Sequence, residues 1–260
     1  MNSKPELGAL RGATPLPISL AGRSPAVLAL HGFGGTPFEV QLVTDAAQSL
    51  GLAASAPLLA GHGSHARDLA RTRFSDWLAS ARDALTALPA GPVIACGLSL
   101  GSLLAIRLAC AEPERITALV LLANATRLSA PFPAWLLAAG GFLRIPDFLM
   151  PKRTSDIADG VARSSHVSYS ADPVHAAIDL QRGAAATRAL LKQVKCPTLI
   201  VHGAHDRVCP VSNAWRVAEA LGTRDVRVLI LPRSHHILTR DLDRDALSAE
   251  LAAFFSRFSG

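Results

Sequence analysis

The sequence predicts an α/β protein whose mostly parallel central sheet is flanked by helices. Short apolar runs alternate along the chain with longer segments of helical spacing. The runs are apolar at nearly every position, which indicates strands buried on both faces, as in a parallel sheet covered by helices on each side. With 260 residues, 50% of them hydrophobic, the chain is long enough for one well-buried core.

Strands and helices alternate through the first half of the chain. The run AVLAL ends in glycine-rich sequence, as a strand entering a loop does, and the residues from Pro37 onward show helical spacing. The same unit then recurs. The predicted strands are 26–30, 52–57, 93–97 and 116–122, and the predicted helices between them are 37–50, 74–88 and 99–111. Strands before residue 26 are hard to see in the pattern.

The alternation stops at 123–195 and then resumes. This interval is rich in proline, glycine and large apolar side chains but has no β-rich run, so it predicts a small helical insertion that lies over another part of the molecule. The later strands are 198–202 and 226–231, and the later helices are 210–221 and 243–258. We therefore expect a core formed by 1–122 and 196–260, with a helical cap at 123–195.

Charge and hydropathy exclude several classes of protein. The formal net charge is +6, but the basic residues are scattered singly, so we expect no nucleic-acid partner. The longest uncharged stretch, 84–106, is interrupted by prolines and glycines, and we expect no stable membrane insertion. The N-terminus has no continuous apolar secretory segment, which predicts a cytoplasmic protein. The four cysteines form no CxxC pair and are expected to be buried.

Ser99 is the central residue of the pentapeptide GLSLG, which lies between a predicted strand and a predicted helix. A serine at such a turn has a strained backbone and an exposed hydroxyl, and its glycine neighbours are needed because a Cβ would collide with the strand and the helix. The N–H groups at the start of the helix can face an anion. The alternative is an ordinary serine in a tight strand-to-helix turn. The context favours Ser99 as a nucleophile.

A nucleophilic serine needs a base and a group that orients the base. Asp206 lies in the loop after the strand 198–202, and His236 follows the strand 226–231. Their order after Ser99 is the one expected when all three groups lie at the carboxyl ends of parallel strands. His235 precedes His236 directly, and we favour His236 as the base.

The glycine-rich HGFGG sequence at 31–35 follows the first strong strand and could fold its backbone over the serine. The backbone N–H groups of Phe33 and Leu100 would then form an oxyanion hole, each donor being worth about 3 kcal/mol of barrier. The alternative is a turn that binds nothing.

Two pairs of histidines at i, i+3 spacing lack further converging ligands, so we expect no metal, and no cofactor is needed.

Six motifs together resemble those of α/β-hydrolase fold enzymes, and most of all the bacterial carboxylesterase and monoacylglycerol lipase branch. They are HGFGGTP, PLLAGHG, the pair Asp76-Trp77, GLSLG, HGAHDRVCP and SHHI, in family order and at similar spacing. The resemblance runs from about residue 26 to the C-terminus. It implies the α/β-hydrolase fold, with a helical cap inserted after the sixth strand. It also implies the roles of nucleophile, orienting acid, base and two oxyanion donors for Ser99, Asp206, His236, Phe33 and Leu100 respectively.

The chain departs from that family at one position next to the base. Family members usually read Ser-Gly-His, whereas this chain reads Ser234-His235-His236. A bulky imidazole therefore stands where a glycine is usual.

The implied activity is that of a serine hydrolase that cleaves carboxylic esters through an acyl-enzyme intermediate. Four cap residues are candidates for an apolar wall around short to medium acyl chains or monoglycerides: Trp135, Leu136, Phe142 and Phe148. Fold and triad leave acyl transfer, C–C bond hydrolysis, amide hydrolysis and perhydrolysis open. A non-catalytic binding protein for a small apolar ligand would be expected to have a defective triad.

Overall fold

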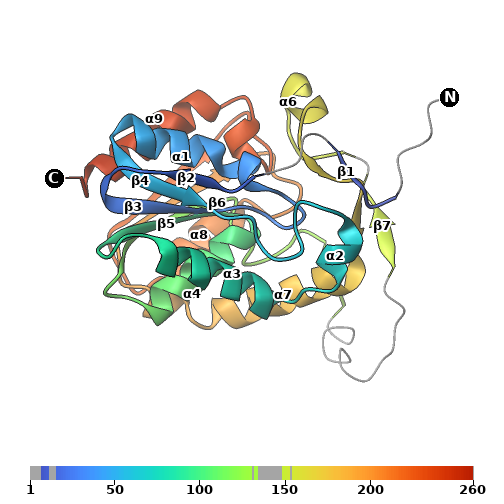
Figure 1. Cartoon of the computed structure of the whole chain (residues 1–260), viewed down its shortest axis with the longest axis horizontal. Coiled ribbons are helices and arrows are strands. Elements are labelled where there is room, and N and C mark those ends of the chain that lie inside the picture. Colours follow the sequence, from blue (N-terminus) through green and yellow to red (C-terminus); the bar gives the residue numbers. More distant parts are fainter. Residues whose placement is uncertain (1–6, 12–15, 131, 134–147, 153, 260) are drawn as a thin grey trace.

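A seven-stranded sheet forms the centre of the molecule (Figure 1). The computed structural model describes residues 7–11, 16–130, 132–133, 148–152 and 154–259. The strand order is β11-β10-β6-β5-β3-β4-β2, and β2 runs antiparallel to β4 while the other pairs are parallel. The strands of this sheet are β2 (Ile18–Leu20), β3 (Arg23–Leu30), β4 (Leu52–Ala56), β5 (Val93–Leu98), β6 (Ile116–Leu122), β10 (Thr198–Gly203) and β11 (Val226–Leu231).

Helices cover both faces of the sheet, as strands that are apolar on both faces require. Residues of α1 (Gln41–Ser49) and α9 (Arg244–Ser256) pack into one buried cluster with one face of the strands. Residues of α3 (Phe74–Ala87), α4 (Leu100–Ala111) and α8 (Ser212–Ala220) pack into a second cluster on the other face. Short helices precede α1 and α3 and link β11 to α9: η1 (Pro37–Val40), α2 (Ala66–Ala70) and η3 (Leu238–Arg240).

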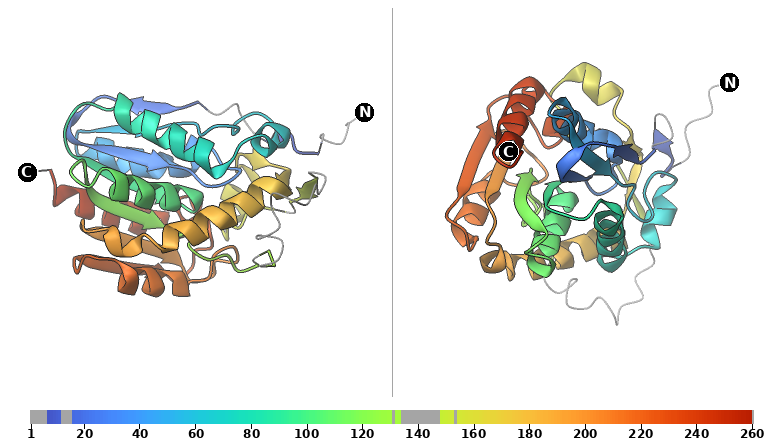
Figure 2. Two further views of the ribbon diagram at one scale, coloured as in Figure 1. Left: turned by 90° about the horizontal axis from the view of Figure 1, so that it is seen from below. Right: turned by 60° about the vertical axis from the view of Figure 1, so that its left-hand side comes forward.

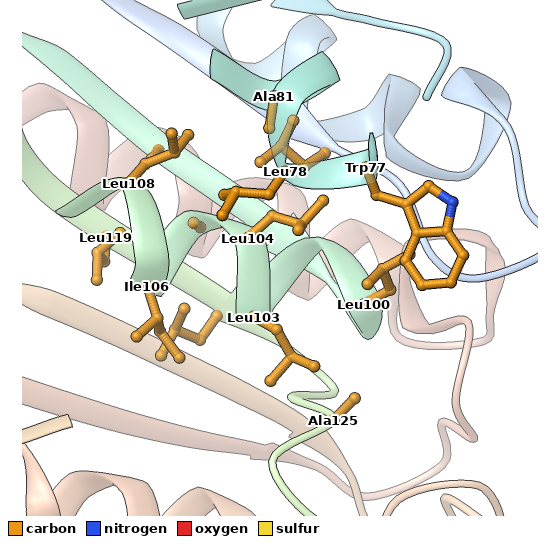
Figure 3. Close-up of a cluster of buried hydrophobic side chains, with 14 of the residues drawn as sticks. Trp77, Leu78, Ala81, Leu100, Leu103, Leu104, Ile106, Leu108, Leu119 and Ala125 are labelled. Carbon is orange, nitrogen blue, oxygen red and sulfur yellow. The ribbon is translucent and has the colours of Figure 1, made fainter. Parts of the chain in front are cut away.

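The core beneath the candidate nucleophile is formed mainly by α4. Leucines on this helix pack against α3, and Trp77 of α3 lies beside Leu100, the first residue of α4 (Figure 3). Trp77 and Leu100 are both fully buried. Burial of a side chain of this size contributes several kcal/mol to stability, so the start of α4 is held in place by its packing.

The interval 123–195 contains both helices and short strands. Its elements are β7 (Leu149–Pro151), α6 (Gly160–Ser164), β8 (Ser168–Tyr169), β9 (Ala171–Pro173), α7 (Val174–Arg188) and η2 (Leu191–Gln193). β7 pairs with β9, and β8 pairs with β1 (Leu10–Arg11), in both cases antiparallel. The helix α7 lies along α4 (Figure 2), and the carboxylate of its Asp179 accepts a hydrogen bond of 2.6 Å from Phe74 N at the start of α3.

The α/β-hydrolase fold predicted from the motifs is the fold observed, with a mostly parallel sheet between two layers of helices. Each predicted strand and helix of the core has a counterpart within a few residues. The structure adds the short strands of the insertion and, near the N-terminus, β1 and β2, which are too short to give a periodic signal. The division between core and cap at residues 122 and 195 stays a prediction.

Within the described ranges, each helix is too short or too polar to cross a membrane.

Candidate active site

Ser99 occupies a strained turn between β5 and α4. Its φ of 54° and ψ of −113° are conformations that residues other than glycine rarely adopt. The turn is tight because a Cβ on Gly97 would lie 2.1 Å from the main chain of Gly101, and one on Gly101 would lie 2.0 Å from the oxygen of Leu30. Ser99 N donates to Leu122 O at 2.9 Å. The sequence therefore presents this hydroxyl at the carboxyl edge of the sheet.

Asp206 and His236 meet at the same edge. His236 Nδ1 lies 2.8 Å from Asp206 Oδ2, and both side chains are almost fully buried. The other carboxylate oxygen, Oδ1, accepts the N–H groups of Val208 and Cys209 at 2.9 and 2.8 Å. With Nδ1 bound to the carboxylate, His236 has Nε2 free for a second partner. His236 and Ser99 line one cavity.

Asp206 and His236 each stabilise the charged form of the other. Burial raises the pKa of Asp206, but the charge of His236 and hydrogen bonds from His202 and His236 outweigh it and hold that pKa well below its usual range. Burial lowers the pKa of His236, but Asp206, with smaller contributions from Asp156 and Glu39, raises it above the usual value. The carboxylate is therefore ionised, and the imidazole is a stronger base than in water.

A second imidazole contacts the same carboxylate. His202 Nε2 lies 3.1 Å from Asp206 Oδ2 and 3.2 Å from Cys209 O, and the His202 side chain is fully buried. Both neighbours are acceptors, so Nε2 carries the proton. His202 thus donates to the same carboxylate oxygen that His236 contacts.

The loop after β3 is held by a neutral histidine. His31 Nδ1 donates to Gly32 O at 2.9 Å, and His31 Nε2 accepts from Leu59 N at 3.1 Å, which defines the tautomer. Burial lowers the pKa of His31, in agreement with a neutral ring. Phe33 follows in this loop and lines the cavity. Leu100 is the first residue of α4, where a backbone N–H has no acceptor within the helix.

Glu39 connects this loop with the cap. Its Oε2 accepts Gly32 N at 3.1 Å, and its Oε1 lies 3.1 Å from His166 Nε2. His166 Nδ1 in turn lies 2.6 Å from Ser155 Oγ. Burial raises the pKa of Glu39, but its bond to His166 leads the contacts that lower it overall, so Glu39 is a buried anion. The loop next to Phe33 therefore contacts the insertion through Glu39 and His166.

The cavity in front of Ser99 has a volume of about 310 Å³ and a mixed lining. Its apolar lining residues are Phe33, Leu128, Ala130, Phe132, Met150, Ala177, Leu180, Val208 and Ile237. Its polar lining residues include Glu39, Lys152, Thr154, Ser155, Asp156, His166, Ser168, Asp172 and Arg207. Such a cavity suits a small molecule with both apolar and polar parts.

Of the four residues predicted to form an apolar wall of the cap, one is among the described residues. Trp135, Leu136 and Phe142 lie outside the described residues. Phe148 is described, but its side chain is 54% exposed and it is not among the residues that line the cavity. The apolar lining comes instead from the segment after β6, from Met150 and from one face of α7.

The adjacent histidine, His235, points to a different partner. Its Nδ1 lies 3.0 Å from Asp156 Oδ1, and it is not among the residues that line the cavity.

Cys209 is buried near Ser99, and burial raises the pKa of its thiol well above the usual value, so it is an uncharged group there. Among the described residues, His, Cys, Asp and Glu nowhere gather in threes that could hold a metal ion.

Four residues at the site were not predicted from the sequence: Glu39, Asp156, His166 and His202. Glu39 could have been suspected, because it is the one charged residue in a loop of glycine and apolar side chains. His202 lies inside an otherwise apolar strand, which also indicates a buried partner. Asp156 and His166 belong to the insertion, where no periodic pattern shows which side chains face the core.

Comparisons with known proteins show which family the chain resembles. The family model described as serine aminopeptidase, S33, matches residues 23–243. A thermostable monoacylglycerol lipase from Bacillus sp. (strain H-257) is 28% identical over 245 residues, which cover 90% of this chain and 91% of the lipase. A carboxylesterase from Bacillus subtilis (strain 168) is 24% identical over 95% of this chain and 99% of its own. A solved structure of the metagenome-derived lipolytic enzymes LipS and LipT matches with a TM-score of 0.86 at 28% identity, covering 95% of this chain and 99% of that one.

Proposed function

Since the chain belongs to the hydrolase family described as serine aminopeptidase, S33, we propose that it cleaves carboxylic esters with Ser99 as nucleophile, His236 as base and Asp206 as orienting acid. The protein is a carboxylic ester hydrolase with lipase and esterase relatives. The observation that carries the residue assignment is the bond of 2.8 Å between His236 Nδ1 and Asp206 Oδ2 at a cavity that Ser99 also lines.

The mechanism follows from the positions of these groups. Ser99 Oγ attacks the ester carbonyl while His236 Nε2 accepts its proton, and Asp206 stabilises the imidazolium that forms. The backbone N–H groups of Phe33 and Leu100 bind the oxygen on which negative charge develops. The C–O bond then breaks, and His236 returns the proton to the leaving alcohol. Water, deprotonated by the same histidine, attacks the acyl-serine and releases the acid.

The mixed lining of the cavity supports a substrate with an acyl chain and a polar alcohol. An acyl chain of short to medium length fits against the apolar lining residues, where each buried methylene contributes about 0.8 kcal/mol. A hydroxylated alcohol, such as the glycerol of a monoglyceride, fits the polar lining residues, among which Ser155, Ser168 and Glu39 offer hydrogen-bonding groups. The name of the monoacylglycerol lipase relative agrees with this choice.

For the location and partners of the enzyme we keep the expectations drawn from its sequence. We propose a cytoplasmic protein that acts on a small ester, without a nucleic-acid partner and without stable membrane insertion.

The test is covalent labelling together with ester turnover. A fluorophosphonate probe is expected to label the wild type once and to leave Ser99→Ala unlabelled, while Ser99→Ala loses more than about 1000-fold in turnover of p-nitrophenyl butyrate. Amino-acid p-nitroanilides serve as the amide counterpart. Equal labelling of Ser99→Ala would refute the nucleophile, and faster turnover of the anilides than of the esters would refute the ester class.

A further inference from the structure

One cap residue, Asp156, contacts both loops that carry the acid and the base. Its Oδ2 accepts a hydrogen bond of 2.9 Å from Arg207 N, next to Asp206. Its Oδ1 lies 3.0 Å from His235 Nδ1, on the residue before His236. The main-chain oxygen of Asp156 accepts Ile237 N at 3.2 Å, on the residue after His236. The catalytic acid and base are thus each flanked by a residue bound to Asp156.

The ring of His235 provides the side-chain contact between the base loop and Asp156. A glycine is usual at this position in the family that the motifs resemble, and a glycine has no ring nitrogen to reach the cap. The His235 side chain is 15% exposed and that of Asp156 is 12% exposed, so water screens the pair only weakly. A charge-assisted bond between two such groups is stronger than one on the open surface.

We propose that Asp156 is a positioning residue that holds the Asp206 loop and the His236 loop at hydrogen-bonding distance from each other. The inference depends on the proposed function, in which Asp206 and His236 act as a pair. The base loop has anchors within the core, since the Asp241 carboxylate accepts His235 N at 2.8 Å and the Asp243 carboxylate accepts Ser234 Oγ at 2.9 Å. Asp156 is the residue through which the cap reaches this loop and the acid loop together.

The charge of Asp156 has a second effect at the base. Asp206 contributes most to raising the pKa of His236 against its burial, and Asp156 and then Glu39 add to it. Arg207 and His166 also line the cavity around His236. Removing the Asp156 carboxylate therefore lowers the pKa of His236, whereas loosening of the cap by itself leaves that charge in place.

A matched control is available in the same part of the cap. Asp159 Oδ2 lies 3.0 Å from Arg244 Nη1 of α9, so Asp159 also joins the insertion to the core. Neither residue lines the cavity. Asp159→Asn removes a cap-to-core ion pair without touching the acid or base loop.

The experiment compares Asp156→Asn, His235→Ala and Asp159→Asn with the wild type on p-nitrophenyl butyrate. For Asp156→Asn we expect kcat to fall about 10- to 100-fold with KM changed less than about threefold, because misplaced catalytic groups affect turnover more than binding. The acidic limb of the pH profile of kcat/KM is expected to move to lower pH. His235→Ala is expected to lose about fivefold, the effect of one missing hydrogen bond. Asp159→Asn is expected to keep both kcat and the pH profile.

Four outcomes would contradict the proposal. An Asp156→Asn enzyme with wild-type kcat and pH profile would show that the contact positions nothing, and equal losses in Asp156→Asn and Asp159→Asn would mean that only cap attachment matters. If Asp156→Asn does not fold, as judged by its thermal unfolding, His235→Ala serves as the test. An unchanged kcat in His235→Ala then refutes the positioning role of Asp156. Histidine-ring NMR of Ser99→Ala reads the pKa of His236 without turnover, so an unchanged pKa in Ser99→Ala with Asp156→Asn contradicts the inference even if the ester assay itself fails.

Discussion

Replacing His202 by leucine removes a donor from the buried Asp206 carboxylate, which has four contacts. Asp206 accepts two backbone N–H groups at Oδ1 and has two imidazoles at Oδ2, and its side chain is fully buried. His202 supplies one of these four contacts, at 3.1 Å, and is itself fully buried. A hydrogen bond to a buried charged group contributes about 2 kcal/mol, whereas His236 and both N–H groups remain to orient the carboxylate.

We therefore expect His202→Leu to lower the free energy of unfolding by about 2 kcal/mol, or the melting temperature by about 4–8 °C, while kcat falls less than about tenfold. The pKa of Asp206 is depressed in the folded protein, so its stabilising contribution is present above the unfolded pKa of about 3.9 and is lost as pH falls through the folded value. In His202→Leu that loss is expected at higher pH.

Urea unfolding at neutral and acidic pH, with turnover measured in parallel, tests these expectations. His205→Ala, at an exposed position in the same loop, is the control and is expected to stay within about 0.5 kcal/mol of the wild type. If His202→Leu unfolds at the same urea concentration as the wild type at every pH, the contact contributes nothing and the reasoning is wrong.

Four further outcomes follow from the site. His236→Ala is expected to lose nearly as much turnover as Ser99→Ala, and His235→Ala much less; the reverse ranking would make His235 the base. The acidic limb of kcat/KM is expected to have its midpoint above the ordinary histidine value of about 6.5, because the paired carboxylate raises the pKa of His236 against its burial, and a midpoint below 6.5 would contradict that pairing. Gly101→Ala is expected to cost about 3 kcal/mol or more in urea unfolding, because its Cβ would lie 2.0 Å from a main-chain oxygen of β3; an unchanged midpoint would show that the turn can relax. For p-nitrophenyl esters, kcat/KM is expected to rise from acetate to butyrate or hexanoate and then to fall, and a profile that declines from acetate onward would contradict binding of the acyl chain by the apolar lining residues.

The sequence alone predicts those candidate site residues that each follow a single strand. Ser99 comes directly after β5, and Asp206 and His236 lie in the loops that follow β10 and β11, so parallel strands bring all three to one edge of the sheet. The pentapeptide around Ser99 adds a requirement for small residues, because a Cβ on Gly97 would lie 2.1 Å from the Gly101 backbone. These are local rules, and they are readable from a single chain.

The contacts between the cap and the core could not be predicted in this way. Asp156 and His235 are separated by 79 residues, and the path of the chain between them is set by the packing of the whole insertion. The strands of the insertion have only two or three residues each, which is too short for a period of two to be recognised. The sequence therefore does not tell which side of the insertion faces Ser99.

The cap shapes the base as well as the cavity. Three carboxylates raise the pKa of His236, and two of them, Asp156 and Glu39, are bound to the cap: Asp156 belongs to it, and Glu39 contacts its His166. Each carboxylate also has partners that stabilise its own charge, so a buried site can hold all three. A strong base needs nearby anions, and buried anions need donors. The core supplies the donors of Asp206 and of Asp156, whereas Glu39 contacts both Gly32 of the core and His166 of the insertion. With His236 as the proposed base, we therefore expect the insertion to affect the acid–base chemistry through Asp156 and through the contact of Glu39 with His166.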